Sequence, residues 1–235
     1  MLSYLYDEDR WPSGAAGGIV TKNKKHRQKT LRFRPEPIAD AETGTAYLPE
    51  DLDFAARKVL IESCAAEGKT YLLATFDVVL DGEGKLAFAR LIAPEAAATG
   101  NKWYAYVVTA ENRGWMNGQA YVDTLSKEAI AEFIRVTYLA YKDAVGDEFG
   151  NTVPSIFTDE PQFAKSDPLP FATDLREVRL PWTTTLPESF LAAYGFDIVP
   201  LLPTIFWDKA SGEPARERYL FRDHTCQLFT EPMSP

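Results

Sequence analysis

Cysteine and histidine are scarce in this sequence. The 235 residues include two cysteines, Cys64 and Cys226, and two histidines, His26 and His224. The cysteines are too far apart for a disulfide framework or metal-ligand spacing, and the histidines do not complete a zinc site. His224 has no serine or cysteine in a nucleophile-elbow motif, which argues against a catalytic triad, and His26 is expected to be exposed in a basic stretch. The residues alone therefore assign no metal ligands and no cofactor.

Long apolar runs and an excess of positive charge are also missing. No stretch approaches the roughly 18 apolar residues of a membrane span. The N-terminus reaches Asp7 and Glu8 without a positively charged leader or a long apolar segment, so no signal peptide is visible. We therefore expect a soluble protein with no membrane partner, and the sequence assigns neither its compartment nor its oligomeric state.

The net charge of −9 argues against a nucleic-acid partner, because nucleic-acid binding depends on basic surface and counterion release. One basic stretch, residues 22–34, departs from this balance. We interpret it as a solvated helix or loop, and a phosphate-binding or nuclear-import patch is the alternative.

The composition is that of a globular protein with many aromatic residues. Hydrophobic residues make up 46% and charged residues 25%, which excludes disorder of the whole chain. The length is sufficient for one large domain or two small ones. Aromatic residues make up 13%, and such side chains both fill cores and stack against sugar rings.

The first half of the chain predicts antiparallel β-structure. Residues 71–92 alternate apolar and polar positions on two arms, and the glycine-containing turn 81–84 between them predicts a β-hairpin. Further strands are predicted over 103–109 and 31–33. Together these segments suggest an antiparallel β insertion over about 31–110.

The second half reads as alternating helix and strand. Ser126 can cap a helix whose apolar residues recur at helical spacing as far as residue 145. A short buried strand is predicted over 153–157, and helix followed by buried strand is the unit of an α/β fold. Prolines in 180–207 allow only short helices such as 188–194, and a helical pattern covers 216–230.

Two predicted strands end in the same acidic pair. The strand at residues 2–6 is followed by Asp7 and Glu8, and the strand at 153–157 is followed, after Thr158, by Asp159 and Glu160. In an α/β barrel the carboxyl ends of the strands meet on the rim that carries the active site. Glycoside cleavage needs a protonated carboxyl group at such a site.

Glu160 is the predicted catalytic acid. An apolar strand end and the neighbouring anion would favour its protonated form, and Pro161 would fix the turn that aims it. The alternative is an ordinary surface Asp-Glu pair after a strand.

Two other segments combine polar and aromatic side chains. Residues 6–18 place acids, an arginine and a tryptophan before a glycine-rich loop that fits no phosphate-binding spacing. Residues 115–123 form a second cluster just before the helix that begins at Ser126. Both could instead be packed structural loops. The residues that we assign to substrate binding are Asp7, Glu8, Arg10, Trp11, Trp115, Asn117, Asp123 and Asp159.

Three segments, 6–18, 117–125 and 156–163, occur in the order and form typical of one enzyme group. On these motifs the chain resembles the α-L-rhamnosidase-like enzymes around glycoside hydrolase family 106, specifically the N-terminal part of the catalytic domain. The resemblance runs through nearly all of residues 1–235 but is weak in the predicted insertion. It implies a partial TIM-like (β/α) barrel with the antiparallel β insertion, and hydrolysis of O-glycosidic bonds with Glu160 as the acid and inversion of configuration.

The resemblance also implies features that these residues do not supply. Family members could use calcium, but no ligand set is assignable. The second half of the barrel and its second carboxylate are expected to lie outside this chain, which would then be a fragment that is inactive alone. The alternatives are a non-catalytic carbohydrate-binding remnant and an unstable fragment.

Overall fold

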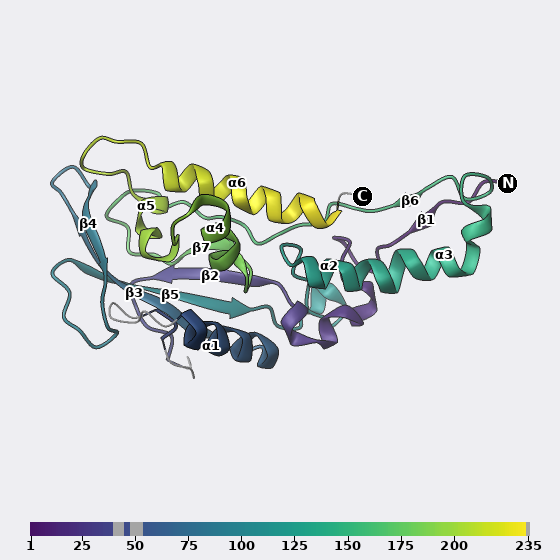
Figure 1. Cartoon of the computed structure of the whole chain (residues 1–235), viewed down its shortest axis with the longest axis horizontal. Helices are drawn as coiled ribbons and strands as arrows, with labels where there is room; N and C mark the ends of the chain where they lie inside the picture. The colour runs from purple at the N-terminus through teal and green to yellow at the C-terminus, as the bar shows by residue number, and fades with distance from the viewer. Residues whose placement is uncertain (40–44, 48–53, 234–235) are drawn as a thin grey trace. The chain divides into compact units, whose positions relative to one another are not determined.

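The computed structural model describes residues 1–39, 45–47 and 54–233. They form two compact units (Figure 1). Unit 1 comprises Met1–Gln28, Ala110–Phe163 and Leu228–Pro235, and unit 2 comprises Lys29–Thr109 and Ala164–Gln227. Residues 40–44 and 48–53 of the predicted β insertion lie outside the described residues.

Unit 2 is built on a five-stranded antiparallel sheet in the order β4-β3-β5-β2-β7. The expected hairpin is present, because β3 pairs with β4 on either side of the 81–84 turn. The strands expected near 31–33 and 103–109 are also present and pair with each other. The strand bounds are β2 Lys29–Arg34, β3 Tyr71–Leu80, β4 Leu86–Leu91, β5 Asn101–Thr109 and β7 Val178–Trp182.

Strand β7 was not expected, because it lies in the proline-containing segment where only short helices were predicted. It forms an edge of the sheet, with Pro181 opposite Thr30 of β2. An edge strand tolerates proline because only one of its sides must supply hydrogen bonds to a neighbour. The sheet of unit 2 therefore extends beyond the predicted 31–110 segment.

Helices pack against one face of this sheet, on which Leu31 and Phe33 of β2 are buried, whereas the alternate residues of β2 are partly exposed. Helices α1 and α4 meet through the Lys58–Glu188 ion pair, and β3 is buried without alternation from Tyr71 to Val78. Phe33 stacks between Trp103 and Phe206, with ring centroids 5.0 Å apart in each pair. The helices are α1 Phe54–Glu67, α4 Leu186–Tyr194, α5 Pro203–Phe206 and α6 Arg216–Thr230, which agrees with the helices expected near 188–194 and over 216–230.

Unit 1 combines a long helical segment with a two-stranded parallel sheet. Strand β1, Leu5–Tyr6, pairs with β6, Ile156–Phe157. Ser126 caps the helix as expected, its Oγ accepting from the Ala129 N–H at 3.3 Å. The helix continues through α2 (Lys127–Ile134), a wider π-turn (Arg135–Leu139) and α3 (Ala140–Val145). Its apolar face is part of a buried cluster made of Ala15, Val20, Met116, Tyr121, Val122, Ala129, Ile130 and Phe133.

Short 3-10 turns occur in both units. They lie at Ala16–Gly18, Val20–Lys22, Lys24–His26, Gly114–Met116, Gly146–Glu148, Val199–Leu201 and Glu231–Met233.

The predicted partial TIM-like barrel is wrong. A barrel requires successive parallel strands, each followed by a helix. Within the described residues, the only parallel pair of strands is β1 with β6, and the larger sheet is antiparallel throughout. The fold is mixed α/β, because the segment between β1 and the helical half forms antiparallel pairs instead of further βα units.

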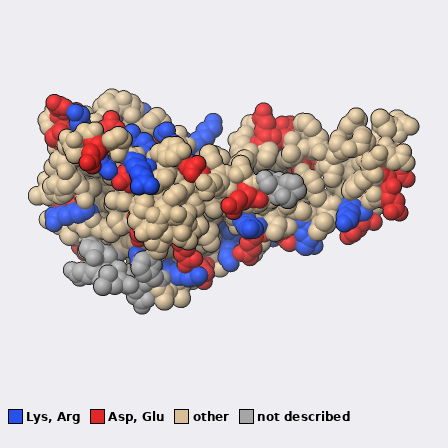
Figure 2. Space-filling view, turned by 45° about the horizontal axis from the view of Figure 1, so that its top comes forward, with Lys and Arg blue, Asp and Glu red and all other residues tan. Residues whose placement is uncertain are grey.

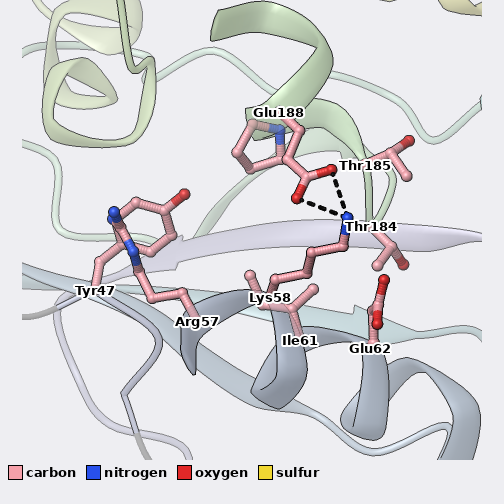
Figure 3. Close-up of a pocket in the computed structure, with 9 residues that line it drawn as sticks. Tyr47, Arg57, Lys58, Ile61, Glu62, Thr184, Thr185 and Glu188 are labelled. Carbon is pink, nitrogen blue, oxygen red and sulfur yellow. Dashed lines mark hydrogen bonds and ion pairs between the residues drawn. The ribbon is translucent and has the colours of Figure 1, made fainter. Parts of the chain in front are cut away.

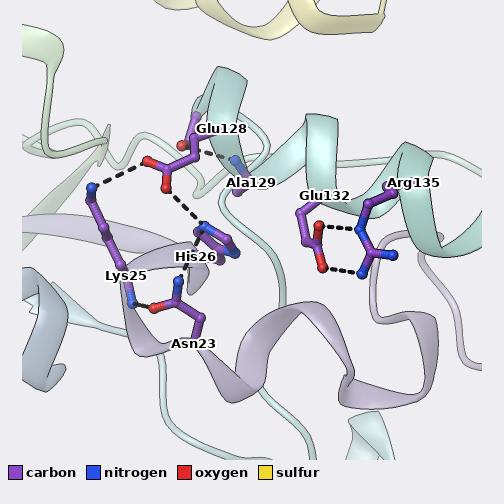
Figure 4. Close-up of polar contacts among 8 residues, drawn as sticks. Asn23, Lys25, His26, Glu128, Ala129, Glu132 and Arg135 are labelled. Carbon is purple, nitrogen blue, oxygen red and sulfur yellow. Dashed lines mark hydrogen bonds and ion pairs between the residues drawn. The ribbon is translucent and has the colours of Figure 1, made fainter.

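The basic stretch is more buried than expected. Lys29 begins β2 and is 2% exposed, and His26 is 7% exposed, so the prediction of an exposed His26 is wrong. His26 Nε2 lies 3.4 Å from Glu128 Oε1, and Lys25 Nζ lies 3.2 Å from Glu128 Oε2 (Figure 4). The start of α2 thus lies over His26, and its Glu128 offsets part of the positive charge of residues 22–34.

Charge on the surface is mixed. On the face drawn in Figure 2, basic side chains lie in small separate groups among acidic ones. Among the described residues, no helix has both the length and the apolar character needed to cross a membrane.

Candidate functional site

The two Asp-Glu pairs lie side by side in unit 1. Strands β1 and β6 are parallel and in register, with Tyr6 opposite Phe157. The chain continuing from β1 therefore carries Asp7 and Glu8 alongside the chain that carries Asp159 and Glu160. The backbone N–H of Asp7 donates to the Phe157 carbonyl at 3.2 Å, which extends the pairing to the first acidic residue.

Asp7 is buried below this edge. It is 5% exposed, and its two carboxylate oxygens accept hydrogen bonds from Ser13 Oγ and Tyr138 OH, both at 2.7 Å. Ser13 Oγ in turn accepts from the Asp159 N–H at 2.8 Å, and the Ser13 N–H donates to the Asp159 carbonyl at 2.9 Å. The side chain of Asp7 thus points into the protein and ties the 6–18 segment to the second acidic pair.

Tyr6 holds the two outer carboxylates together. Its hydroxyl forms a short hydrogen bond with Glu8 and a 2.9 Å hydrogen bond with Asp159. The hydrogen bond to Glu8, the partial loss of solvent and the hydrogen bond to Asp159 raise the pKa of Tyr6 well above its ordinary value. Tyr6 therefore keeps its proton near neutral pH, and its single O–H donates to one of these two carboxylates at a time.

Glu160 lies at the open edge of the cluster. Its backbone has a φ of +44°, a left-handed conformation that is uncommon for residues other than glycine. Its Oε2 accepts from Trp11 Nε1 at 3.2 Å. Glu160 is exposed, so the protein alone does not provide the apolar surroundings expected at this position.

Two exposed tryptophans form the aromatic part of the site. Trp11 and Trp115 are 39% and 58% exposed and meet edge to face, with ring centroids 6.4 Å apart. Trp115 Nε1 donates to the Trp11 carbonyl at 2.9 Å. Arg10 fixes the second ring, because its guanidinium lies 4.3 Å from the Trp115 ring centroid and its Nε donates to the Trp115 carbonyl at 2.6 Å.

The remaining predicted residues are Asn117, at the end of the turn that carries Trp115, and Asp123, just before α2. Asn117 is exposed and ends the 3-10 turn that carries Trp115, with a φ of +53°. Asp123 is 1% exposed, and its Oδ1 accepts from the Leu125 N–H at 3.2 Å, just before α2. Asp123 therefore shapes the turn that leads into α2.

Several residues that hold the site were not predicted. Tyr141 OH donates to the Tyr6 carbonyl at 2.8 Å, and Tyr121 OH donates to the Ser13 carbonyl at 2.7 Å. Tyr138, which bonds Asp7, lies in the π-turn of the helix, and such turns are frequent at functional sites. Tyrosines on an otherwise apolar helical face were the available signal, since a buried tyrosine needs a partner for its hydroxyl.

The buried tyrosines act as neutral donors. Burial and the hydrogen bond to Asp7 raise the pKa of Tyr138 to about 12. Burial is also the main cause that raises the pKa of Tyr121. The framework under the acidic edge therefore keeps its donor groups over the whole physiological pH range.

The donor set does not fit a calcium ion. In the part of the chain that the structure describes, no group of three or more His, Cys, Asp or Glu side chains is arranged to hold a metal ion. At the acidic edge the Tyr6 hydroxyl already bridges Glu8 and Asp159. The calcium that the resemblance implies therefore has no role in the chemistry derived below.

Unit 2 offers weaker alternatives. A small hollow of about 40 Å³ lies beside α1 and α4 (Figure 3), but Lys58 there pairs with Glu188, and Arg57 stacks over Tyr47. His224 does have a serine neighbour, with its Nε2 2.8 Å from Ser189 Oγ. Ser189 is in the middle of α4 and lines neither this hollow nor the other one described in unit 2.

The acidic and aromatic cluster of unit 1 is thus the best-formed candidate site. It brings together Glu8, Arg10, Trp11, Trp115, Asp159 and Glu160, with Asp7 beneath them. Comparison of the chain with protein-family models, with curated proteins and with solved structures gives no match.

Proposed function

We propose that this chain carries the catalytic carboxylates of a glycoside hydrolase that acts on O-glycosidic bonds, with α-L-rhamnosides as the first substrates to test. The observation that carries the proposal is the meeting of two Asp-Glu strand ends beside two exposed indoles. Glycoside cleavage needs paired carboxyl groups close to a bound sugar ring, and exposed tryptophans provide the flat apolar surface on which such a ring stacks.

The geometry supports distinct roles for the carboxylates. Glu160 is assigned as the acid, because it is the exposed carboxyl group that contacts an exposed indole, Trp11. Glu8 and Asp159 are the candidates for the second carboxylate, since the Tyr6 hydroxyl holds both at the same edge. Asp7 has a positioning role, because both of its oxygens are occupied inside the protein.

The test is Glu160→Gln, which keeps the shape of the side chain but removes its transferable proton. We expect turnover of aryl α-L-rhamnosides to fall by about 100-fold or more, which is typical for the loss of a general acid. Glu148→Gln is the matched control, because Glu148 is an exposed glutamate of the same unit outside the cluster. Near-wild-type turnover by Glu160→Gln would remove Glu160 from this role.

A second candidate function is carbohydrate binding without catalysis. The exposed indole pair and the Arg10 contact favour it, because these groups can hold a sugar without any proton transfer. Calorimetry with rhamnose-containing glycosides and product analysis on the same samples distinguish the two functions. Binding that is lost in Trp115→Ala, together with the absence of product, would support the binding function over the hydrolase.

A further inference from the structure

Unit 2 contains a second hollow, separate from the acidic cluster. It has a cavity volume of about 230 Å³ and lies between residues 166–169, β7, α5 and α6. A cavity of this volume admits only a small ligand, and ligand sites are mostly apolar, with a few polar groups that orient the ligand. Nothing in the proposed glycosidase chemistry uses this hollow.

The floor of the hollow is apolar. Leu180 of β7, Ile205 of α5 and Phe221 of α6 line it and are themselves 3%, 7% and 2% exposed. Leu169 closes part of the wall. A ligand seated here would therefore bury an apolar body of modest size.

Some of the charged side chains that the structure describes around this floor form ion pairs, and one does not. Asp167 accepts from Arg179 Nε at 2.6 Å, and Arg218 is paired with Asp208 at 2.9 Å. Arg222 also lines the hollow, one helical turn after Arg218 on α6, and is exposed. Among the described residues it has no ion pair or hydrogen bond through its side chain. One positive charge therefore remains available beside the apolar floor.

We propose that this hollow binds a small monocarboxylate with an apolar body, whose carboxylate pairs with Arg222. A guanidinium recognises a carboxylate through two parallel hydrogen bonds. A monoanion is favoured over a dianion such as phosphate, because one unpaired cation is present and the Asp167 carboxylate lies in the same wall.

The experiment uses the whole 235-residue chain with phenylacetate as the probe, followed by calorimetry and ligand-observed NMR. We expect a Kd of about 1 mM, as for a fragment of this size. Phenylacetamide, which has the same shape without the charge, should bind at least about ten-fold more weakly, and so should inorganic phosphate.

Arg222→Gln should weaken phenylacetate binding by about ten-fold or more, and Arg222→Lys should restore part of it. Arg216→Gln is the matched control, because Arg216 is exposed on the same helix but does not line the hollow. The proposal is overturned if phenylacetate does not bind, if Arg222→Gln binds it as the wild type does, or if phosphate binds more tightly.

Discussion

At the scale of single residues, buried carboxylates organise both units. Asp7 in unit 1 and Asp77 in unit 2 are 5% and 0% exposed. Burying a carboxylate is unfavourable unless hydrogen bonds or a counter-charge compensate for the lost water. Each of these side chains therefore accepts hydrogen bonds from more than one other segment of the chain, and each fixes those segments in place.

Asp7→Asn should destabilise unit 1. Both Asp7 oxygens accept hydrogen bonds, whereas an asparagine amide has a single acceptor atom and would turn its NH₂ group toward one of the two hydroxyls. We expect the free energy of unfolding to fall by about 1–3 kcal/mol, measured by urea denaturation. Asp9→Asn is the control, since Asp9 is exposed and among the described residues its carboxylate accepts a single hydrogen bond, from Gln119 Nε2 at 3.2 Å. An equal loss in both variants would contradict the argument.

Asp77→Asn should destabilise unit 2 in a pH-dependent way. Burial disfavours the ionised form of Asp77, but hydrogen bonds from Thr99, Gly100 and Arg90 outweigh it and lower the pKa well below the usual range. A lowered folded-state pKa adds stability that is complete above the unfolded value of about 3.9 and is lost as the pH falls through the folded value.

The Asp77→Asn variant should therefore lose about 2 kcal/mol at pH 7, and the difference from the wild type should shrink as the pH is lowered below about 4. Urea denaturation across this pH range measures it. Asp208→Asn should cost less than about 1 kcal/mol, because its ion pair with Arg218 is at the surface and the Asp208 side chain is 76% exposed. A pH-independent loss for Asp77→Asn would contradict the assignment.

The kinds of residue at the site could be predicted from the sequence, but the burial of their side chains could not. The acids, the arginine and the tryptophan of residues 6–11 predict a cluster from sequence, and the structure gathers most of them. Asp7 and His26 were expected to face solvent or substrate, yet both are buried. Burial depends on which helix covers a residue, and that helix, which begins near Ser126, is about 100 positions away in the chain.

At the scale of elements, Gly100 links strand geometry to the Asp77 network. A Cβ at this position would lie 2.1 Å from the Val78 carbonyl oxygen, a backbone atom of the neighbouring strand β3. Gly100→Ala should therefore push β5 away from β3 and cost about 2 kcal/mol or more. Gly82→Ala, in the hairpin turn where a Cβ meets nothing within 4 Å, should be close to neutral by thermal denaturation. Equal melting temperatures would refute this prediction.

The elements with strong local patterns were predictable. The β3–β4 hairpin carries alternation and a glycine turn, and the helix that starts at Ser126 carries both a cap and an apolar stripe. Strand β7 was missed because its proline pattern resembles that of a loop. The barrel prediction was wrong because the ends of two parallel strands resemble the rim of a barrel locally. The number of parallel strands in a sheet depends instead on long-range pairing, which the local sequence does not specify.

At the scale of the molecule, the two units should differ in local stability. Strand β3 of unit 2 is buried continuously from Tyr71 to Val78, whereas the β1–β6 sheet has two short strands with intermediate or exposed residues. Two-stranded sheets are marginal unless they pack against other elements. Hydrogen exchange should show the amides of Tyr6 and Phe157 exchanging at least about ten-fold faster than those of Leu73 and Ala105. Equal protection would contradict this difference.

The open edge of β7 shows how the sheet of unit 2 ends. The Arg179 carbonyl accepts from the Asp167 N–H at 2.9 Å and so faces away from β2. Pro181, two residues later, points its backbone in the same direction and has no N–H to offer. An approaching strand from another molecule would find one acceptor occupied and one donor missing, so this edge resists the strand-to-strand association that leads to aggregation.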